Sequence, residues 1–137
     1  MRRTEAITRL VLAVFYGFAG VMHIAAPEPF LKITPSFVPW KETVVFWTGI
    51  AEIAGAIALL QPFSRALMQA GGIGLAVYAL CVFPANINHF AMDMAREGGG
   101  LGLAYHIPRM VAQPLLIWLA LWCAEVPMQR ITDTNRR

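Results

Sequence analysis

Charged residues are scarce in this 137-residue chain, and the scarcity limits the classes of protein to which it can belong. Only 14% of the residues are Asp, Glu, Lys or Arg, whereas 58% are hydrophobic. Soluble domains average about 25% charged residues, and a domain of this length cannot bury so large an apolar fraction. We therefore expect the chain to be a single membrane domain, residues 1–137, with the lipid bilayer as its first partner.

Cysteine is also rare, which excludes several kinds of redox and metal chemistry. Cys81 and Cys123 stand singly in apolar segments, without a CxxC spacing. A disulfide framework, an iron–sulfur cluster or a zinc site needs paired or clustered ligands. We interpret both cysteines as small buried hydrophobic residues and predict no metal site.

Long apolar stretches are abundant instead, and four of them dominate the sequence. They cover about residues 7–26, 43–61, 65–89 and 107–126. Each is close to the roughly 20 residues that a helix needs to cross the hydrocarbon of a bilayer. The stretches do not alternate as barrel strands do, so helices are the only structures that satisfy their backbone groups in lipid. The sequence predicts an all-α fold, a four-transmembrane-helix bundle.

The basic residues are unevenly distributed along this predicted bundle. With four crossings, seven of them fall on the side of the termini: Arg2, Arg3, Arg9, Arg65, Arg130, Arg136 and Arg137. The positive-inside rule then places both termini in the cytoplasm. Because the basic residues flank helix ends, the net charge of +3 does not indicate a nucleic-acid partner.

Two loops lie on the opposite, outer side of the predicted bundle. The loop over 27–42 contains four prolines among apolar residues, so it is neither one continuous helix nor a solvated linker. We expect a short segment that lies at the lipid headgroups, with Trp40 as an anchor, or that roofs the mouth of the bundle. The loop over 90–106 contains three consecutive glycines.

Small and polar residues share faces of the predicted helices, at spacings of three and four residues. One face of the first helix carries Ala13, Tyr16, Gly20 and His23, and one face of the fourth carries Arg109, Gln113, Leu116, Ala120 and Cys123. Small residues let helices approach closely in a membrane, so we expect these faces to point inward.

Five polar residues interrupt the apolar stretches: His23, Glu52, Asn86, Arg109 and Gln113. In a four-helix bundle all five fall in the outer half of the bilayer, at depths set by the rise of about 1.5 Å per residue. Polar groups in hydrocarbon are costly and usually mark an internal site. We interpret these five as candidate ligand-binding residues around one cavity.

Glu52 is the most informative of the five, and the only candidate catalytic residue. A carboxylate in hydrocarbon needs a partner, and an arginine there needs an anion. We therefore expect a pair between Glu52 and Arg109, either structural or in contact with a ligand. His89 and His106 are expected near the outer surface, and a metal site built from histidines and Glu52 has no supporting HxxH or HxxxH spacing.

Prolines adjoin two of these polar residues. Pro84 cannot donate to the Leu80 carbonyl, and Pro114 cannot donate to the Met110 carbonyl. We expect both to kink their helices and to widen the outer cavity near Asn86 and Gln113.

Four short runs carry a resemblance to a known family. They are Gly17-Phe18-Ala19-Gly20 with His23, Gly49-Ile50-Ala51-Glu52, Phe83-Pro84-Ala85-Asn86-Ile87, and Arg109 with Gln113. In this order they resemble the DoxX-like family of small four-helix membrane proteins, over about residues 7 to 123. The resemblance implies a multi-pass protein of a bacterial inner membrane, associated with redox or sulfur metabolism or with the assembly of membrane complexes.

Three functions agree with these observations. In the first, the cavity binds a quinone or another lipophilic small molecule, as part of a redox-linked membrane complex with other subunits. In the second, the chain is a non-catalytic accessory or assembly subunit, and its Glu–Arg pair is structural. In the third, the chain is a membrane isomerase or cyclase that uses Glu52 as an acid or base.

Overall fold

The computed structural model describes residues 3–127, and within this range the protein is all-α, with five helices and no strand. The helices are α1 (Arg3–Ala25), α2 (Glu28–Ile33), α3 (Lys41–Leu60), α4 (Arg65–Met94) and α5 (Leu103–Cys123). The predicted all-α fold is confirmed. Four basic residues of the orientation prediction, Arg2, Arg130, Arg136 and Arg137, lie outside the described residues.

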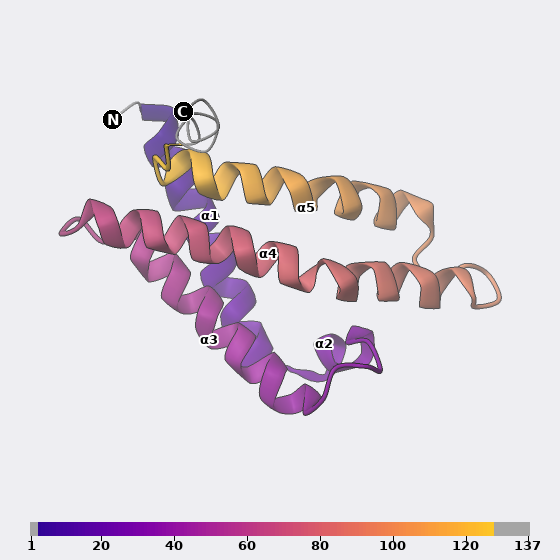
Figure 1. The fold of residues 1–137 in the computed structure, drawn as a ribbon. Helices are drawn as coiled ribbons and strands as arrows, with labels where there is room; N and C mark the ends of the chain where they lie inside the picture. Colours follow the sequence, from indigo (N-terminus) through magenta and orange to yellow (C-terminus); the bar gives the residue numbers. More distant parts are fainter. Residues whose placement is uncertain (1–2, 128–137) are drawn as a thin grey trace, which may run out of the picture.

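The four long helices form two pairs. Helix α1 packs along α3, and α5 packs along α4, while α3 also contacts α4 (Figure 1). The first turns of α1 adjoin the end of α5, where Arg9 Nη2 lies 3.9 Å from Glu125 Oε1. From this junction the two pairs diverge, one toward α2 and the other toward the turn between α4 and α5 (Figure 1).

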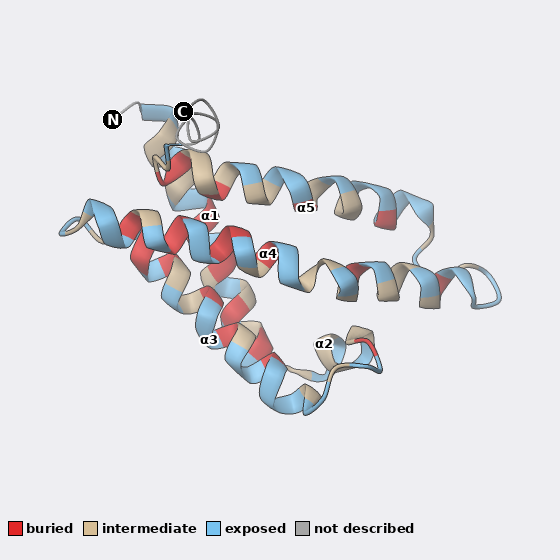
Figure 2. Cartoon of the chain, in the orientation of Figure 1, coloured by how far each residue is buried: buried red, intermediate tan, exposed pale blue. Residues whose placement is uncertain are grey.

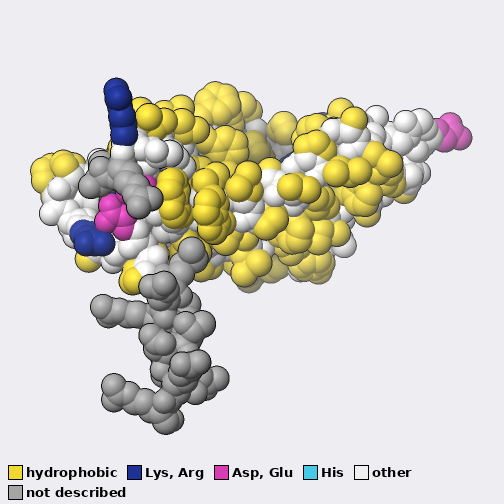
Figure 3. Space-filling view, turned by 90° about the horizontal axis from the view of Figure 1, so that it is seen from above, with side chains coloured by type: hydrophobic (Ala, Val, Ile, Leu, Met, Phe, Trp, Pro, Cys, Tyr) yellow, Lys and Arg dark blue, Asp and Glu magenta, His cyan; other side chains and the backbone are white. Residues whose placement is uncertain are grey.

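Three helices among the described residues are long and apolar enough to cross a membrane: α1, α3 and α4. Their outer surfaces expose large hydrophobic side chains such as Phe18, Trp47 and Leu80. Figure 3 shows one such face, on which hydrophobic side chains occupy the middle and charged ones the ends. The chain is thus a membrane protein with helical spans. The 21-residue α5 is not among the three, because Arg109 and its polar neighbours lower its hydropathy.

The buried core lies where the two helix pairs meet (Figure 2). Tyr16, Leu59, Leu75 and Cys123 are fully buried there. Glycines allow the helices to approach: a Cβ added at Gly20 of α1 would lie 2.6 Å from the Gly49 carbonyl oxygen of α3. Such contact between small residues replaces the hydrophobic effect as the source of packing in lipid.

Local sequence signals explain where the helices begin and end. Helix α1 stops just before Pro27, and Pro27 and Pro29 fit the first positions of α2, where a missing N–H costs nothing. The Ser64 hydroxyl caps α4 by accepting a hydrogen bond from the Leu67 N–H at 3.2 Å. Neither Pro84 nor Pro114 interrupts its helix.

The outer loops are shorter than we predicted. The proline-rich loop over 27–42 contains a short helix, α2, and the loop over 90–106 shrinks to residues 95–102. Helix α4 continues to Met94, and α5 begins at Leu103. Residues of the predicted loop hold the two helix ends together, because Asp93 accepts hydrogen bonds from the Leu101 N–H and from His106. Four glycines with positive φ, at 98, 99, 100 and 102, make the tight turn that remains.

Candidate functional site

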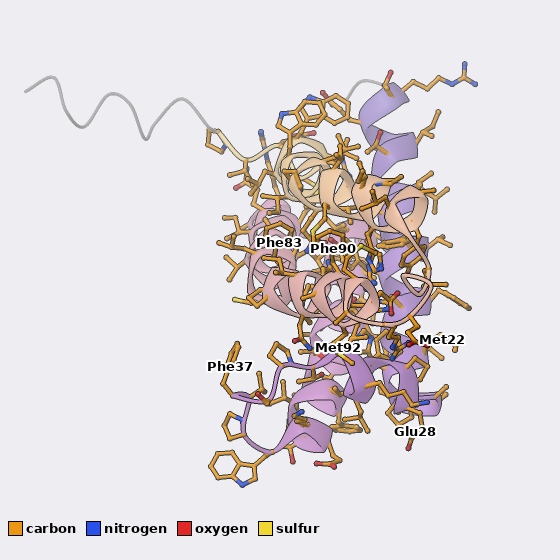
Figure 4. All side chains as sticks on the ribbon, turned by 90° about the vertical axis from the view of Figure 1, so that its right-hand side faces the viewer. Met22, Glu28, Phe37, Phe83, Phe90 and Met92 are labelled. Atoms are coloured by element: carbon orange, nitrogen blue, oxygen red, sulfur yellow. The ribbon has the colours of Figure 1, made fainter. Side chains whose placement is uncertain are left out.

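A cavity of about 440 Å³ lies between the two helix pairs, at the end where they diverge. All five helices contribute to its wall, and most of the lining is apolar. The α2 segment closes one side: Phe30, Ile33 and Phe37 line the cavity, and the Asn88 amide of α4 donates to the Ile33 carbonyl at 2.9 Å. Figure 4 views this end and shows Met92 between α4 and the α2 segment. The segment therefore roofs part of the cavity, as one of the two expectations stated, while its position at the lipid headgroups stays a prediction.

The five polar residues singled out in the sequence all line this cavity. His23 comes from α1, Glu52 from α3, Asn86 from α4, and Arg109 and Gln113 from α5. The structure therefore brings them together, but not in the pairs that we expected.

Glu52 pairs with His23, not with Arg109. The His23 Nδ1 atom lies 2.8 Å from Glu52 Oε2, and both side chains are almost completely buried. Our expected Glu52–Arg109 pair was wrong because the glycine contact between α1 and α3 brings His23 directly beside Glu52. The His23 ring also stacks on Phe30 of the roof, with 3.7 Å between ring centroids.

The Glu52 carboxylate is nevertheless incompletely satisfied. The His23 ring nitrogen is in hydrogen-bonding geometry with the Ala19 carbonyl at 2.9 Å, so its contact with Glu52 is a close charge contact rather than a well-directed hydrogen bond. Among the described residues, Glu52 Oε2 and the Tyr16 hydroxyl are buried without a hydrogen-bond partner. Both residues line the cavity. Buried polar atoms without partners are rare in folded proteins and require an explanation.

Asn86 and Gln113 form an amide pair on the opposite side of the cavity. The Asn86 Nδ2 atom donates to Gln113 Oε1 at 2.9 Å, and Gln113 Nε2 donates to the Ala79 carbonyl. Gln113 thus binds the wall of α4 one turn before Pro84, and not at the Leu80 carbonyl that the proline leaves without its usual donor. The pair joins α4 to α5 inside the bundle.

Arg109 turns toward the outer end of α4. Its Nη1 atom lies 2.7 Å from His89 Nδ1 and 3.3 Å from the Tyr105 hydroxyl. Within the described residues it makes no ion pair with a carboxylate. Because a guanidinium only donates, His89 Nδ1 must be the acceptor, and the proton of the neutral ring is then on Nε2.

Asp93 is a second buried carboxylate and lies near the end of α4. Its Oδ2 atom accepts from His106 Nε2 at 3.0 Å and from the Leu101 N–H at 3.1 Å, and lies 3.5 Å from His89 Nε2. Its Oδ1 atom lies 3.4 Å from Arg96 Nη1. We call these residues (His89, Asp93, Arg96, Leu101 and His106) the Asp93 cluster.

Three members of the Asp93 cluster also have the chemistry of metal ligands. His89, Asp93 and His106 each offer one ligand atom, and these atoms lie within 4.8 Å of one another. The observed hydrogen bonds oppose a cation, however. With Arg109 donating to Nδ1, the proton of the His89 ring is on Nε2, which faces Asp93, and a second arginine, Arg96, contacts Asp93. The arrangement is that of a carboxylate held by donors.

The sequence analysis missed the Asp93 cluster. His89 and Asp93 are four residues apart on one helix, a spacing that places both side chains on one face. This spacing did not lead to a prediction of a contact, because residues 90–106 were expected to form a loop. The partner His106 could not be found from spacing, since the glycine turn brings it to Asp93.

These features define a class: an all-α membrane protein whose helices enclose a polar-lined cavity. Comparison with protein families adds a match over residues 12–124 to the family described as Domain of unknown function (DUF8561). The match covers most of the chain, so the protein belongs to this family. Searches of curated proteins and of solved structures found no match.

Proposed function

We propose that this protein is a four-helix membrane bundle, similar to DoxX-like proteins, that binds a lipophilic small molecule with a polar head in its cavity. The observation that carries the proposal is the pair of unsatisfied buried atoms, Glu52 Oε2 and the Tyr16 hydroxyl, in the cavity wall. A ligand head group would supply the missing hydrogen bonds. The volume of about 440 Å³ lies in the range of small-molecule sites, roughly 300–1,000 Å³.

The ligand class follows from the lining. Apolar side chains such as Phe15, Val82 and Leu116 suit an isoprenoid or alkyl tail, and the polar residues on the two sides of the cavity would bond to a head that lies between them. A quinone fits this division when Glu52 is protonated and donates to a ring carbonyl, and the reduced quinol fits when a ring hydroxyl donates to the Glu52 carboxylate. The Glu52–His23 pair would hold or release a proton beside the head, while a partner subunit of a redox complex would exchange electrons with it.

The topology belongs to the same proposal. If α5 crosses the bilayer beside α4, the chain has four spans and both ends lie on the cytoplasmic side of a bacterial inner membrane. The pairing of α5 with α4 over its length supports this, since its apolar face then meets lipid and its polar residues meet the cavity.

The proposal is tested by purifying the protein in a mild detergent and identifying co-purifying lipophiles by mass spectrometry of the extract. Glu52→Gln removes the acceptor while keeping the shape, and Glu97→Gln is the matched control, because Glu97 is exposed outside the cavity. We expect one quinone or isoprenoid enriched in the parent and in Glu97→Gln, and depleted in a folded Glu52→Gln variant. Bulk lipid alone in all three samples would contradict the proposal and favour the accessory-subunit role.

A further inference from the structure

Only one nitrogen of the Arg109 guanidinium makes hydrogen bonds among the described residues, and this asymmetry indicates which head groups the cavity accepts. Both hydrogen bonds of the guanidinium, with His89 and with the Tyr105 hydroxyl, are made by Nη1, and the group also lies over the Tyr105 ring. Among the described residues, no hydrogen bond is made by its Nε or Nη2 atoms. The N–H groups of Nε and Nη2 form one fork with parallel donors, the geometry that matches two oxygen acceptors side by side. Arg109 is one of the residues that line the cavity.

The Asp93 cluster explains why Nη1 is the atom that is used. Asp93 is 1% exposed and is fixed by the Leu101 N–H and by His106. The same Oδ2 atom faces His89 Nε2 at 3.5 Å, which favours the ring proton on that nitrogen. The other nitrogen of His89 is then a free acceptor, and it meets Arg109 Nη1 at 2.7 Å. A series of polar contacts, from Asp93 through His89, thus fixes the orientation of Arg109.

The net charge around Arg109 favours a head group with oxygen acceptors. Arg109 lines the cavity without a carboxylate partner among the described residues, Arg96 already faces Asp93, and the His23–Glu52 pair contributes no net charge if it shares one proton. This part of the cavity wall therefore carries a positive excess, which attracts oxygen acceptors and repels ammonium groups.

We propose that Asp93 and His89 are positioning residues that hold the Nε–Nη2 fork of Arg109 toward the cavity, and that this fork selects ligands whose head presents paired oxygen acceptors. This inference rests on the proposed function and names the chemistry of the head group. A carboxylate and a quinone with neighbouring ring oxygens share that chemistry. An alcohol presents one oxygen only, so it cannot place a separate acceptor in line with each of the two donors.

The test compares three probes with the purified protein in nanodiscs: laurate, decylubiquinone and 1-dodecanol. We expect at least one of the two paired-acceptor probes to bind about tenfold more tightly than dodecanol, the effect of one additional charge-assisted hydrogen bond. Which of the two binds distinguishes a carboxylate from a quinone as the head group. Equal affinity for all three probes would overturn the assignment of the fork while leaving the cavity as a binding site.

Variants of His89 separate positioning from a merely structural role. His89→Leu removes the acceptor for Arg109, and His89→Asn places an amide oxygen near the position of Nδ1 but is too short to replace the contact with Asp93. We expect His89→Leu to lose the preference for paired acceptors and His89→Asn to retain part of it. If the two variants lose the preference equally, or if neither does, His89 does not position Arg109. His106→Gln is the matched control, because its amide can still donate to Asp93 and it does not touch Arg109.

A ligand-free measurement keeps this inference distinct from the proposed function. Nitrogen-15 NMR of histidine-labelled protein reports which ring nitrogen carries the proton, and the His89 signal is identified by its loss in His89→Asn. The contacts from Asp93 through His89 to Arg109 require that His89 near pH 7 is the neutral tautomer with its proton on Nε2. A proton on Nδ1 would overturn the positioning role even if the cavity binds a probe. If no probe binds at all, the proposed function and the head-group assignment fail together, and the tautomer alone decides the role of His89.

Discussion

Two buried carboxylates, Glu52 in the cavity wall and Asp93 near the end of α4, differ in how completely they are satisfied. Four donors face Asp93: a backbone N–H, two histidines and an arginine. Glu52 has one close neighbour of opposite charge, His23, and a hydrogen bond with the Tyr78 side chain, but its Oε2 atom keeps no hydrogen bond among the described residues. A saturated carboxylate stabilises the fold, whereas an unsaturated one in a cavity wall is available to a ligand.

The largest effect on stability is expected at Asp93. Asp93→Asn replaces an acceptor by an amide group whose N–H atoms face the donors of His106 and Leu101. We expect this substitution to lower the Tm more than Glu52→Gln or Gln113→Leu does, measured by thermal unfolding in one detergent. The comparison between the carboxylates fails if Asp93→Asn lowers the Tm no more than Glu52→Gln does.

A second prediction concerns the turn that brings His106 to Asp93. Gly100 has φ +56°, and a Cβ there would collide with the Asp93 side chain. Gly100→Ala should destabilise the protein by about 1–3 kcal/mol, because backbone strain adds to the collision. The matched control is Gly98→Ala, which has φ +83° and nothing within 4 Å of its added Cβ. Equal losses in the two variants would mean that the Asp93 cluster does not depend on the close approach of Gly100.

A third prediction concerns the amide pair on the other side of the cavity. Gln113→Leu leaves the Asn86 amide and the Ala79 carbonyl without their partner. We expect a loss of about 1–2 kcal/mol in the free energy of unfolding, the upper range for polar contacts between membrane helices. The control is Gln69→Leu, which removes one bond to the Glu125 carbonyl at a partly exposed position. A smaller loss for Gln113→Leu than for Gln69→Leu would contradict the buried pair.

Much of this fold follows from the sequence, because lipid leaves helices as the only stable form for long apolar stretches. The inward face predicted for the first helix is the face that is buried, with Ala13, Tyr16, Gly20 and His23 all on it. In α5 the predicted face is buried at Gln113, Ala120 and Cys123. Spacing along one helix is a local property, so a single sequence carries it.

The partners of the polar residues could not be read in the same way. Glu52 pairs with His23 instead of Arg109 because two glycines let α1 and α3 touch, and contacts between helices depend on their crossing point. His106 reaches Asp93 through a turn of four glycines with positive φ. Both are long-range consequences of packing, whereas the clustering of five polar residues around one cavity follows from depth alone.

The most direct measurement of the central claim combines ligand occupancy and stability in one variant. Native mass spectrometry of the intact protein and of Glu52→Gln, with the Tm of each, reports whether Glu52 serves a ligand or the fold. Glu52→Gln keeps the shape of the side chain, and the His23 ring stays neutral once its charged neighbour is gone, so no uncompensated charge is buried and we predict only a small fall in Tm. We also predict a bound lipophile at one per chain in the parent and none in Glu52→Gln. An unchanged occupancy together with a large fall in Tm would contradict the account.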